Sequence, residues 1–292
     1  MCCTPARSAR RSRDSMARVG DYELFRQYET VNVYRRGPGA KVELNRPDRL
    51  NAWSNQFALD LLAAIKEVTD NPEVRAVVVT GAGRAFSSGA DLKEVADRPD
   101  GETINDSLDV YRRLTERYHP IITGLRLMPK PVIAAVNGPA AGIGLSLALA
   151  CDLVVAAQSA FFQLAFVNIG LVPDGGSSVF VPARVGFTRA AELAMLGERL
   201  DAATALNWGL INRVWPDAEF AEQSDALLDR LASGATQSYA GTKRQLNHWM
   251  YERMDAQLEF EAGIQRELAA SGDFAEGVAA FVAKRPPRFS GA

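Results

Sequence analysis

Several features are scarce in this chain of 292 residues. It has three cysteines, Cys2, Cys3 and Cys151, too few and too unevenly spaced for a disulfide framework or a zinc site. No apolar run approaches the roughly 20 residues that a membrane-spanning helix requires. Neither sign of charge dominates, because 33 Lys and Arg stand against 35 Asp and Glu. We therefore expect a cytoplasmic protein with no metal, no membrane span and no nucleic-acid partner.

Histidine is also rare, which limits the catalytic classes available. His119 precedes Pro120, where we expect a helix to end, and His248 lies in a stretch that is typical of a surface helix. Neither histidine has an evident nucleophile and third partner. A serine or cysteine triad is therefore not expected.

The first 19 residues differ in composition from the rest. They are rich in Arg and Ser, carry a single acid, Asp14, and have no apolar stretch, which excludes a secretory signal. We interpret residues 1–19 as a disordered extension, or as residues upstream of a true start at Met16. A transit peptide is the alternative.

The remaining sequence alternates between strand and helix patterns. Residues 22–44 predict two strands joined by a turn at 36–39. Helices and strands are then expected in turn at 54–69, 76–80, 103–128, 131–136, 143–150 and 153–156. This alternation predicts an α/β fold with substantial parallel sheet. Beyond Gly176 the pattern is helical apart from an apolar break at 210–214, so we divide the chain into an α/β core at 20–215 and a helical region at 216–292.

Two glycine-containing segments, each leaving an expected strand, carry the chemistry. The first, TGAGRAFSSGADLKE at 80–94, lacks the glycine spacing of a dinucleotide fingerprint and the lysine of a P-loop. The second, VNGPAAGIGLS at 136–146, passes from a strand through a turn into a helix of small residues. Free backbone N–H groups at such a helix start stabilise a developing negative charge. The alternative role of Gly142 and Gly144 is close packing of the helix against a strand.

These segments resemble the two signature segments of the crotonase (enoyl-CoA hydratase/isomerase) superfamily. The matching phrases, in the family's order, are LNRP at 44–47, FSSGADLKE at 86–94, NGPAAG at 137–142, ACDL at 150–153, FVNIGLVP at 166–173 and FVAKRPP at 281–287. The resemblance extends over residues 22–289. It implies a crotonase-like core, a spiral of ββα repeats, and a helical C-terminal trimerisation region. A homotrimer, or a hexamer made of two trimers, is the implied assembly.

The resemblance also implies where an acyl-CoA substrate binds. In the family the thioester oxygen lies between two backbone N–H groups, which correspond here to Ala90 and Ile143. Ile143 stands where the family usually has glycine. The implied CoA contacts are Ser88, Ala90, Asp91, Leu92, Phe281 and Lys284. Lys284 and Arg285 are candidate phosphate contacts, and an ordinary solvated lysine is the alternative for Lys284. No prosthetic group is expected.

The reaction depends on which carboxylates are present. Hydratases of the family use two glutamates, and the corresponding positions here are Ser146 and Phe166, neither of which can act as a base. Eight residues past Phe166, where isomerases of the family carry a carboxylate, the sequence has Asp174. Apolar neighbours such as Ile143 are expected to desolvate Asp174 and raise its pKa, which makes it a better general base. The alternative role of Asp174 is an N-cap for the helix that follows.

We therefore expect an acyl-CoA isomerase, in which Ala90 and Ile143 hold a thioester enolate and Asp174 moves the proton. The phrases around Asp174 and near the end resemble those of phenylacetate-pathway isomerases, which act on an epoxide of phenylacetyl-CoA or on unsaturated acyl-CoAs. Two alternatives are a hydratase that uses Asp174 with a second group, and a protein that binds CoA thioesters with little turnover. The acyl pocket is expected to be walled by residues 95–118, beginning with a polar loop at 98–102.

Overall fold

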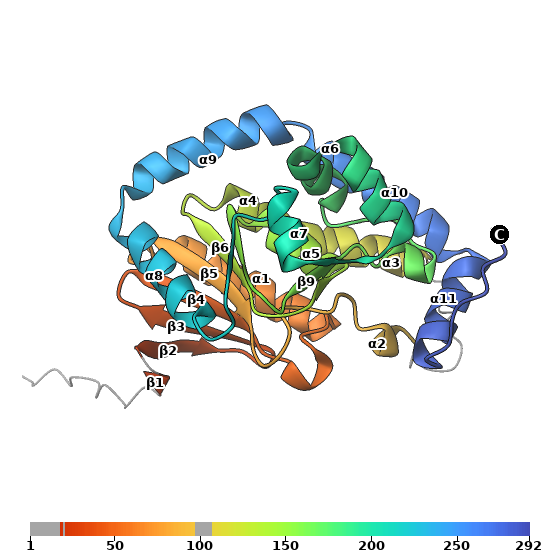
Figure 1. Cartoon of the computed structure of the whole chain (residues 1–292), viewed down its shortest axis with the longest axis horizontal. Helices are drawn as coiled ribbons and strands as arrows, with labels where there is room; N and C mark the ends of the chain where they lie inside the picture. Colours follow the sequence, from red (N-terminus) through yellow and green to blue (C-terminus); the bar gives the residue numbers. More distant parts are fainter. Residues whose placement is uncertain (1–17, 20, 97–106) are drawn as a thin grey trace, which may run out of the picture.

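A computed structural model describes residues 18, 19, 21–96 and 107–292 of the chain (Figure 1). Most of the expected extension at 1–19 and the expected loop at 98–102 lie outside the described residues.

The centre of the molecule is an eight-stranded sheet in the order β1-β2-β3-β4-β5-β6-β8-β11. Its strands are β1 (Arg18–Val19), β2 (Tyr22–Gln27), β3 (Val31–Arg36), β4 (Gly39–Leu44), β5 (Ala76–Gly81), β6 (Val132–Val136), β8 (Leu153–Ala157) and β11 (Arg213–Trp215). Strands β1 to β4 pair antiparallel, and β4, β5, β6, β8 and β11 pair parallel. The predicted α/β class with substantial parallel sheet is confirmed.

One detail of the strand prediction is wrong. The pattern predicts one strand across residues 22–34, whereas the structure has two, β2 and β3, separated by a turn. The turn forms because Tyr28 N–H donates to Val31 O at 2.8 Å, and because the buried Asp60 carboxylate accepts from Thr30 N–H and from its hydroxyl, both at 2.8 Å. Two residues of the apolar break at 210–214, Arg213 and Val214, belong to the sheet as part of its edge strand β11.

Helices cover the sheet and continue beyond it. They are α1 (Asn55–Asp70), α2 (Leu92–Ala96), α3 (Ser107–Arg113), α4 (His119–Leu127), α5 (Ile143–Ala150), α6 (Ser177–Leu196), α7 (Ala202–Asn207), α8 (Phe220–Ser233), α9 (Thr236–Tyr251), α10 (Met254–Ala269) and α11 (Gly272–Val282). A small second sheet has the order β10-β9-β7, formed by β7 (Ala140–Ala141), β9 (Phe161–Gln163) and β10 (Arg199–Asp201). In the described parts of the chain, no helix is both long and apolar enough to span a bilayer.

One helix prediction needs correction at His119, which does not end a helix. Residues Leu114–Tyr118 form a π-helical turn between α3 and α4, and the N–H of His119 donates five residues back to the carbonyl of Leu114. Proline has no N–H to donate, and the wider turn admits Pro120 at the start of α4 without breaking the chain direction. The helical path from α3 to α4 is therefore continuous.

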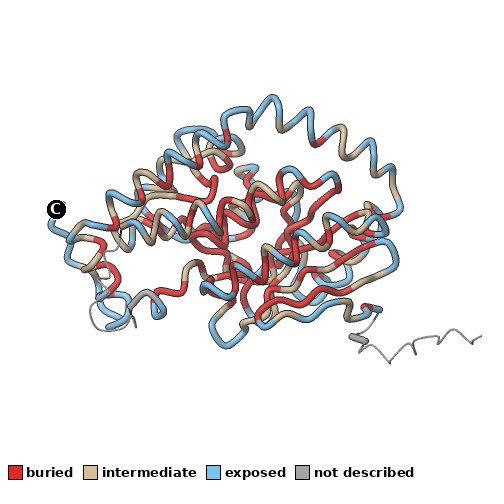
Figure 2. Tube along the Cα trace, turned by 180° about the vertical axis from the view of Figure 1, so that it is seen from behind, coloured by how far each residue is buried: buried red, intermediate tan, exposed pale blue. Residues whose placement is uncertain are grey.

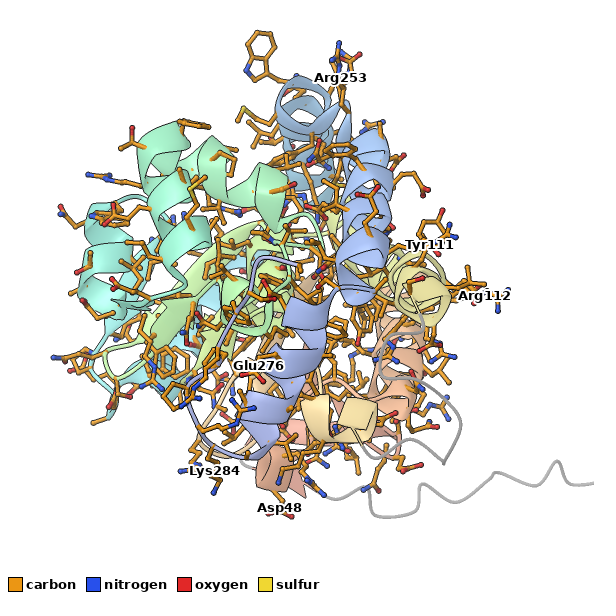
Figure 3. All side chains as sticks on the ribbon, turned by 90° about the vertical axis from the view of Figure 1, so that its right-hand side faces the viewer. Asp48, Tyr111, Arg112, Arg253, Glu276 and Lys284 are labelled. Atoms are coloured by element: carbon orange, nitrogen blue, oxygen red, sulfur yellow. The ribbon has the colours of Figure 1, made fainter. Side chains whose placement is uncertain are left out.

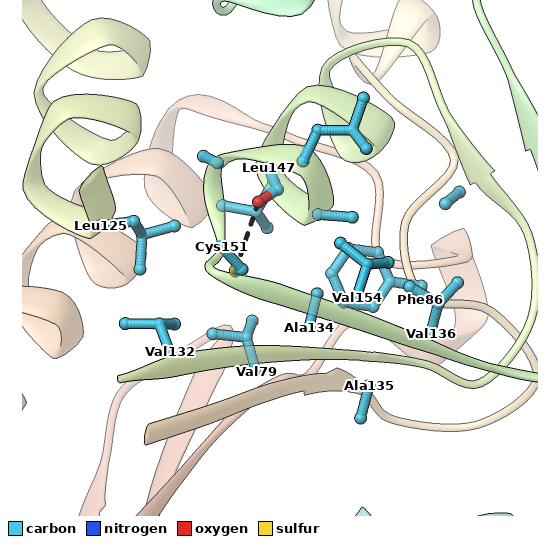
Figure 4. Packing of buried hydrophobic residues seen from close by; sticks show 14 of the residues in the cluster. Val79, Phe86, Leu125, Val132, Ala134, Ala135, Val136, Leu147, Cys151 and Val154 are labelled. Atoms are coloured by element: carbon cyan, nitrogen blue, oxygen red, sulfur yellow. Dashed lines mark hydrogen bonds between the residues drawn. The ribbon is translucent and has the colours of Figure 1, made fainter. Parts of the chain in front are cut away.

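The buried residues form one main core along the sheet and the helices on it (Figure 2). The helix α5 is buried at all eight positions, so it runs through the interior. Cys151, just after α5, lies among Val79, Leu125 and Val132, and its Sγ is 3.5 Å from Leu147 O (Figure 4). Burial raises the pKa of the Cys151 thiol to about 12, so this thiol stays protonated and is not a nucleophile.

Candidate active site

The two glycine-containing segments come together in the structure. Ser87 and Ala140 form a parallel bridge, and Ala141 N–H donates to Ser87 O at 2.9 Å. Gly144 allows this approach, because a Cβ at this position would lie 2.6 Å from Ser87 O. Gly89, at φ +96°, has a backbone conformation that residues with a side chain rarely adopt. The packing role of the glycines is therefore present, and it places the two segments against each other.

Beside this contact, one backbone N–H group from each segment is free at a predicted oxyanion position. Ala90 lies in a bridge with Trp53, and the hydrogen bonds of this bridge go to the neighbours of Ala90. The Trp53 N–H donates to Gly89 O at 2.8 Å, and the Trp53 carbonyl accepts from Asp91 N–H at 3.0 Å. Ile143 is the first residue of α5, where a backbone N–H has no partner within the helix. Neither the Ala90 nor the Ile143 N–H has an acceptor among the described residues. Free donors at these two positions match the expected oxyanion site.

A cavity of about 1040 Å³ opens at these groups, slightly larger than the roughly 300–1,000 Å³ common for small-molecule sites. Every site residue predicted from the sequence lines it: Ser88, Ala90, Asp91, Leu92, Ile143, Asp174, Phe281 and Lys284. These residues come from segments nearly 200 positions apart. The structure thus brings the predicted set together, and the roles assigned to its members stay predictions.

Asp174 is the buried carboxylate at the inner part of this set. Its side chain is 7% exposed, and its Oδ2 accepts from Gln265 Nε2 of α10 at 2.7 Å. Its Oδ1 has no hydrogen-bond partner among the described residues. The next residue, Gly175, packs against the start of α5, since a Cβ there would lie 2.3 Å from Ile143 Cδ1. Asp174 therefore stands beside the helix whose first N–H is free.

The alternative role of Asp174 as a helix cap is not what the structure has. Helix α6 begins at Ser177, and Gly176 is its N-cap at φ +82°. The carboxylate that accepts from the helix start belongs to Glu261, which is 2.8 Å from Gly176 N and 3.2 Å from Ser178 N. Only the main-chain carbonyl of Asp174 takes part in the turn, since Ser177 Oγ donates to it at 2.8 Å. The Asp174 side chain is thus left for the cavity.

The surroundings of Asp174 change its acidity strongly. Burial, with the negative charge of Glu261, raises the pKa of Asp174 to about 8, against the opposing hydrogen bond from Gln265. Burial also raises the pKa of Glu261 to about 7, although the hydrogen bonds from Ser178 and Gly176 oppose this. A carboxyl group with a pKa near neutral pH exists in both protonation states, as acid–base catalysis requires. The predicted rise in the pKa of Asp174 is present.

Ser146 and Phe166, at the positions of the hydratase glutamates, have other contacts. Ser146 is fully buried, and its Oγ donates to the Asp174 carbonyl at 2.7 Å. Phe166 is 6% exposed and lines the cavity, close to Gly142. Two other carboxylates line the cavity in the described residues: Asp48 is exposed, and Asp91 is held by Arg46 at 3.0 Å. No second buried and unpaired carboxylate therefore accompanies Asp174 in the described lining.

Residues near the C-terminus form another part of the cavity lining, among them Phe281, Lys284 and Arg285. Phe281 of α11 is 55% exposed, and Lys284 follows the helix in a left-handed conformation at φ +53°. Figure 3 shows Lys284 directed outward at the lower end of the molecule, where Asp48 also lies. Arg285, the other candidate phosphate contact, is paired with Glu276 at 2.6 Å. Lys284 has no ion-pair partner among the described residues, and neither have the exposed Arg49, Arg84 and Lys93 of the same lining, so Lys284 is one of several cations available there.

Comparison with known proteins identifies the family. The enoyl-CoA hydratase/isomerase family model matches residues 39–292. The chain belongs to the enoyl-CoA hydratase/isomerase family. Among its relatives in this family, a probable enoyl-CoA hydratase of Rhodobacter capsulatus is 41% identical over 90% of this chain and 99% of its own length. The 1,2-epoxyphenylacetyl-CoA isomerase of Escherichia coli is 40% identical over 86% of this chain and 94% of its own.

Solved structures of the family confirm the crotonase fold. A crystal structure of an enoyl-CoA hydratase from Mycobacterium avium subsp. paratuberculosis superimposes with a TM-score of 0.80 at 39% identity, covering 90% of this chain and all of that one. The predicted superfamily and fold class are therefore confirmed, as is an enzyme of the hydratase/isomerase family.

Sequence reasoning missed Gln265, which bonds the Asp174 carboxylate, and Glu261, which bonds the backbone shortly after it; both belong to α10. Both are buried, at 1% and 2% exposure. The sequence feature that could have indicated them is a polar residue at helical spacing from apolar residues. Leu258, Ala262 and Ala269 are the buried apolar residues of this pattern on α10. A polar residue on an apolar face indicates a buried partner, although the sequence does not say which one.

Proposed function

We propose that this enzyme is an acyl-CoA isomerase that moves a proton through a thioester enolate. The observation that supports this most directly is the free oxygen of a buried carboxylate, Asp174 Oδ1, which is the one such carboxylate in the described lining of the cavity that also contains the free Ala90 and Ile143 N–H groups. One carboxylate is sufficient to take a proton from one carbon and return it to another. Water addition, as in hydratases of the family, uses two.

The two N–H groups are proposed to bind the thioester oxygen. Removing a proton next to a thioester carbonyl places negative charge on that oxygen, and preorganised donors stabilise the charge as it forms. One donor of this kind is typically worth about 2.7–4 kcal/mol. Because both groups belong to the backbone, Ile143 supplies its N–H as glycine would.

The remaining parts of the cavity fit the two ends of the substrate. Phe166 and Leu171 line it and keep water from the reacting carbons. Lys284 offers a charge to the phosphates of CoA at the exposed rim, with Asp91 and Leu92 on the same side of the thioester site as Ala90. A 3-enoyl-CoA and the epoxide of an aryl-acetyl-CoA are both proposed substrates, the second because of the similarity to the Escherichia coli isomerase.

Replacing Asp174 by Asn tests the proposal. The change keeps the size of the side chain and removes its ability to accept a proton, so we expect kcat for conversion of a 3-enoyl-CoA to a 2-enoyl-CoA to fall by about 10²–10⁴-fold. Acyl-CoA binding, measured by calorimetry, is expected to stay within a few-fold. The matched control is Asp48→Asn, which removes an exposed carboxylate from the same cavity.

Full activity of the Asp174→Asn enzyme would contradict the proposal. Two further assays separate the alternatives. A 3-hydroxyacyl-CoA product from a 2-enoyl-CoA would indicate a hydratase, and binding of acyl-CoA with no exchange of the α-hydrogen with solvent deuterium would indicate a binding protein.

A further inference from the structure

Helix α10 presents two buried polar side chains to the segment that carries Asp174. Glu261 and Gln265 are four residues apart and therefore lie on one face of the helix. Glu261 is 2% exposed and Gln265 is 1% exposed. A buried polar side chain is costly unless it is bonded, so the contacts of these two show what this face of α10 does.

Gln265 holds the Asp174 carboxylate by one of its oxygens. Its Nε2 donates to Asp174 Oδ2 at 2.7 Å and to Val172 O at 2.9 Å. The amide group has two N–H donors, and these two bonds use both of them. The side chain of Asp174 is thereby tied to the backbone of its own segment, and Oδ1 is the oxygen left without a partner among the described residues.

Glu261 holds the other side of the same segment. It accepts from Gly176 N at 2.8 Å, from Ser178 N at 3.2 Å and from Ser178 Oγ at 2.5 Å. These bonds fix the backbone directly after Asp174 and the first turn of α6. They also place a second carboxylate near Asp174, although Glu261 itself does not line the cavity.

We propose that Gln265 and Glu261 are positioning residues for Asp174: Gln265 orients the carboxylate and favours its ionised form, whereas Glu261 fixes its backbone and favours the protonated form. This inference rests on the proposed function, because it takes Asp174 as the group that moves the proton. Neither residue is a catalytic residue, since both act through Asp174.

The charges around Asp174 support opposite effects of the two residues. Burial comes first among the causes that raise the pKa of Asp174, the charge of Glu261 comes second, and the bond from Gln265 lowers it. From α3 and its π turn, the titratable groups are Tyr118, whose pKa burial raises to about 12, and Arg113. Helices α5 and α6 contribute only the hydroxyls of Ser146 and Ser177, which bond the Asp174 carbonyl.

The test compares Gln265→Met with Glu261→Gln. Carboxyl ¹³C NMR of protein labelled at aspartate follows the titration directly, and Asp174→Asn identifies the resonance.

Gln265→Met removes a hydrogen-bond donor to the charged carboxylate, so the pKa of Asp174 is expected to rise by about one to two units. In Glu261→Gln the negative charge is removed while an acceptor for the helix start remains, so the pKa is expected to fall. At pH 7 and saturating substrate, kcat of Gln265→Met is expected to drop about ten-fold or more, as its ionised fraction does.

Two controls separate positioning from a general effect on α10. Glu267→Gln makes the same charge change at an exposed position of the helix, and Gln257→Met removes a donor to Ser178 Oγ that does not reach Asp174. Both are expected to leave the Asp174 titration in place. Gln265→Glu, nearly the same shape, is a second variant if Gln265→Met does not fold, and its added carboxyl is expected to raise the pKa further.

The outcomes distinguish this inference from the proposed function. Opposite shifts in the titration, followed by the pH profile of kcat, support the inference. Unchanged titrations, or shifts in the same direction in Gln265→Met and Glu261→Gln, overturn it even if Asp174→Asn is inactive. Full activity of Asp174→Asn contradicts the proposed function, whatever the titration of its neighbours.

Discussion

At the scale of a single residue, the two oxygens of Asp174 differ. Oδ2 is bound by Gln265, and Oδ1 has no partner among the described residues. A proton shuttle must release its proton as readily as it takes it, so its pKa should lie near the working pH. An exposed aspartate, with a pKa near 4, holds a proton too weakly to return it efficiently. Burial removes this mismatch, because it raises the pKa of Asp174 to about 8.

The pH dependence of the reaction follows from this pKa. The base is the ionised form, so kcat/KM for 3-enoyl-CoA isomerisation is expected to rise with pH, by about ten-fold per unit below the pKa, and to level off above about pH 8. An ordinary aspartate would give a flat profile from about pH 5 upward. Rates measured from pH 6 to 9.5 test this, with acyl-CoA binding measured at each pH as the control. A flat profile would contradict it.

The sequence predicted Asp174 and missed the residues that give it its properties. A motif match identifies a position, such as Asp174 eight residues beyond Phe166, because the spacing is local. Gln265 lies 91 positions from Asp174, and only folding makes them neighbours. The identity of a long-range partner is set by packing, which a residue pattern does not report.

At the scale of elements, the active site depends on how closely two loops approach. The prediction of α5 at residues 143–150 matches its observed bounds, and α1 begins one residue after the predicted start because Ser54 caps it, its Oγ accepting from Phe57 N–H at 3.1 Å. Local capping and periodicity set such bounds. The contact of Ser87 with Ala140 depends instead on the whole sheet, so only the resemblance, and no local pattern, pointed to it.

Substituting Gly144 by Ala tests the importance of this approach. The new Cβ would lie 2.6 Å from Ser87 O and 2.7 Å from Ser87 Cβ, so the segment carrying Ala90 must shift relative to α5. A shift of about 1 Å between the two N–H groups is expected to lower kcat about 10²-fold, and overpacking is expected to cost about 1–3 kcal/mol of unfolding free energy. Enzyme kinetics and urea denaturation measure the two effects.

A matched glycine serves as the control for Gly144→Ala. Gly263, in α10, has open space where a Cβ would be, so Gly263→Ala is expected to leave kcat unchanged and to stabilise the fold by about 0.5–1 kcal/mol. Equal effects of the two substitutions would mean that the clash with Ser87 does not matter.

At the scale of the whole molecule, the fold agrees with the family, and it buries Asp174, whose charge affects the free energy of unfolding. The predicted α/β core and the helices beyond residue 216 are present, and Leu228 of α8 and Leu258 of α10 belong to the same main core as the sheet. The trimer-based assembly expected from the resemblance stays a prediction. The buried carboxylate of Asp174 has no ion-pair partner among the described residues. Its effect on stability arises within the single chain and can be predicted without knowing the assembly.

The free energy of unfolding should therefore depend on pH through Asp174. The folded pKa of about 8 lies above the ordinary value of 3.8, so between these values the folded state holds a proton that the unfolded state has lost. Stability is then highest at low pH and falls as pH rises towards 8, by at most on the order of 1 kcal/mol per pH unit. Asp174→Asn has no such proton, so its stability is expected to exceed that of the wild type increasingly from pH 5 to pH 8.

Urea denaturation at one protein concentration measures both proteins, with Asp48→Asn as the exposed control. The raised pKa of Glu261 adds a slope to both curves, so it is the difference between the curves that reports Asp174 and its coupling to Glu261. Parallel curves would mean that Asp174 is ionised at neutral pH in the folded enzyme, and the base would then have to lift its proton with the strength of an ordinary aspartate.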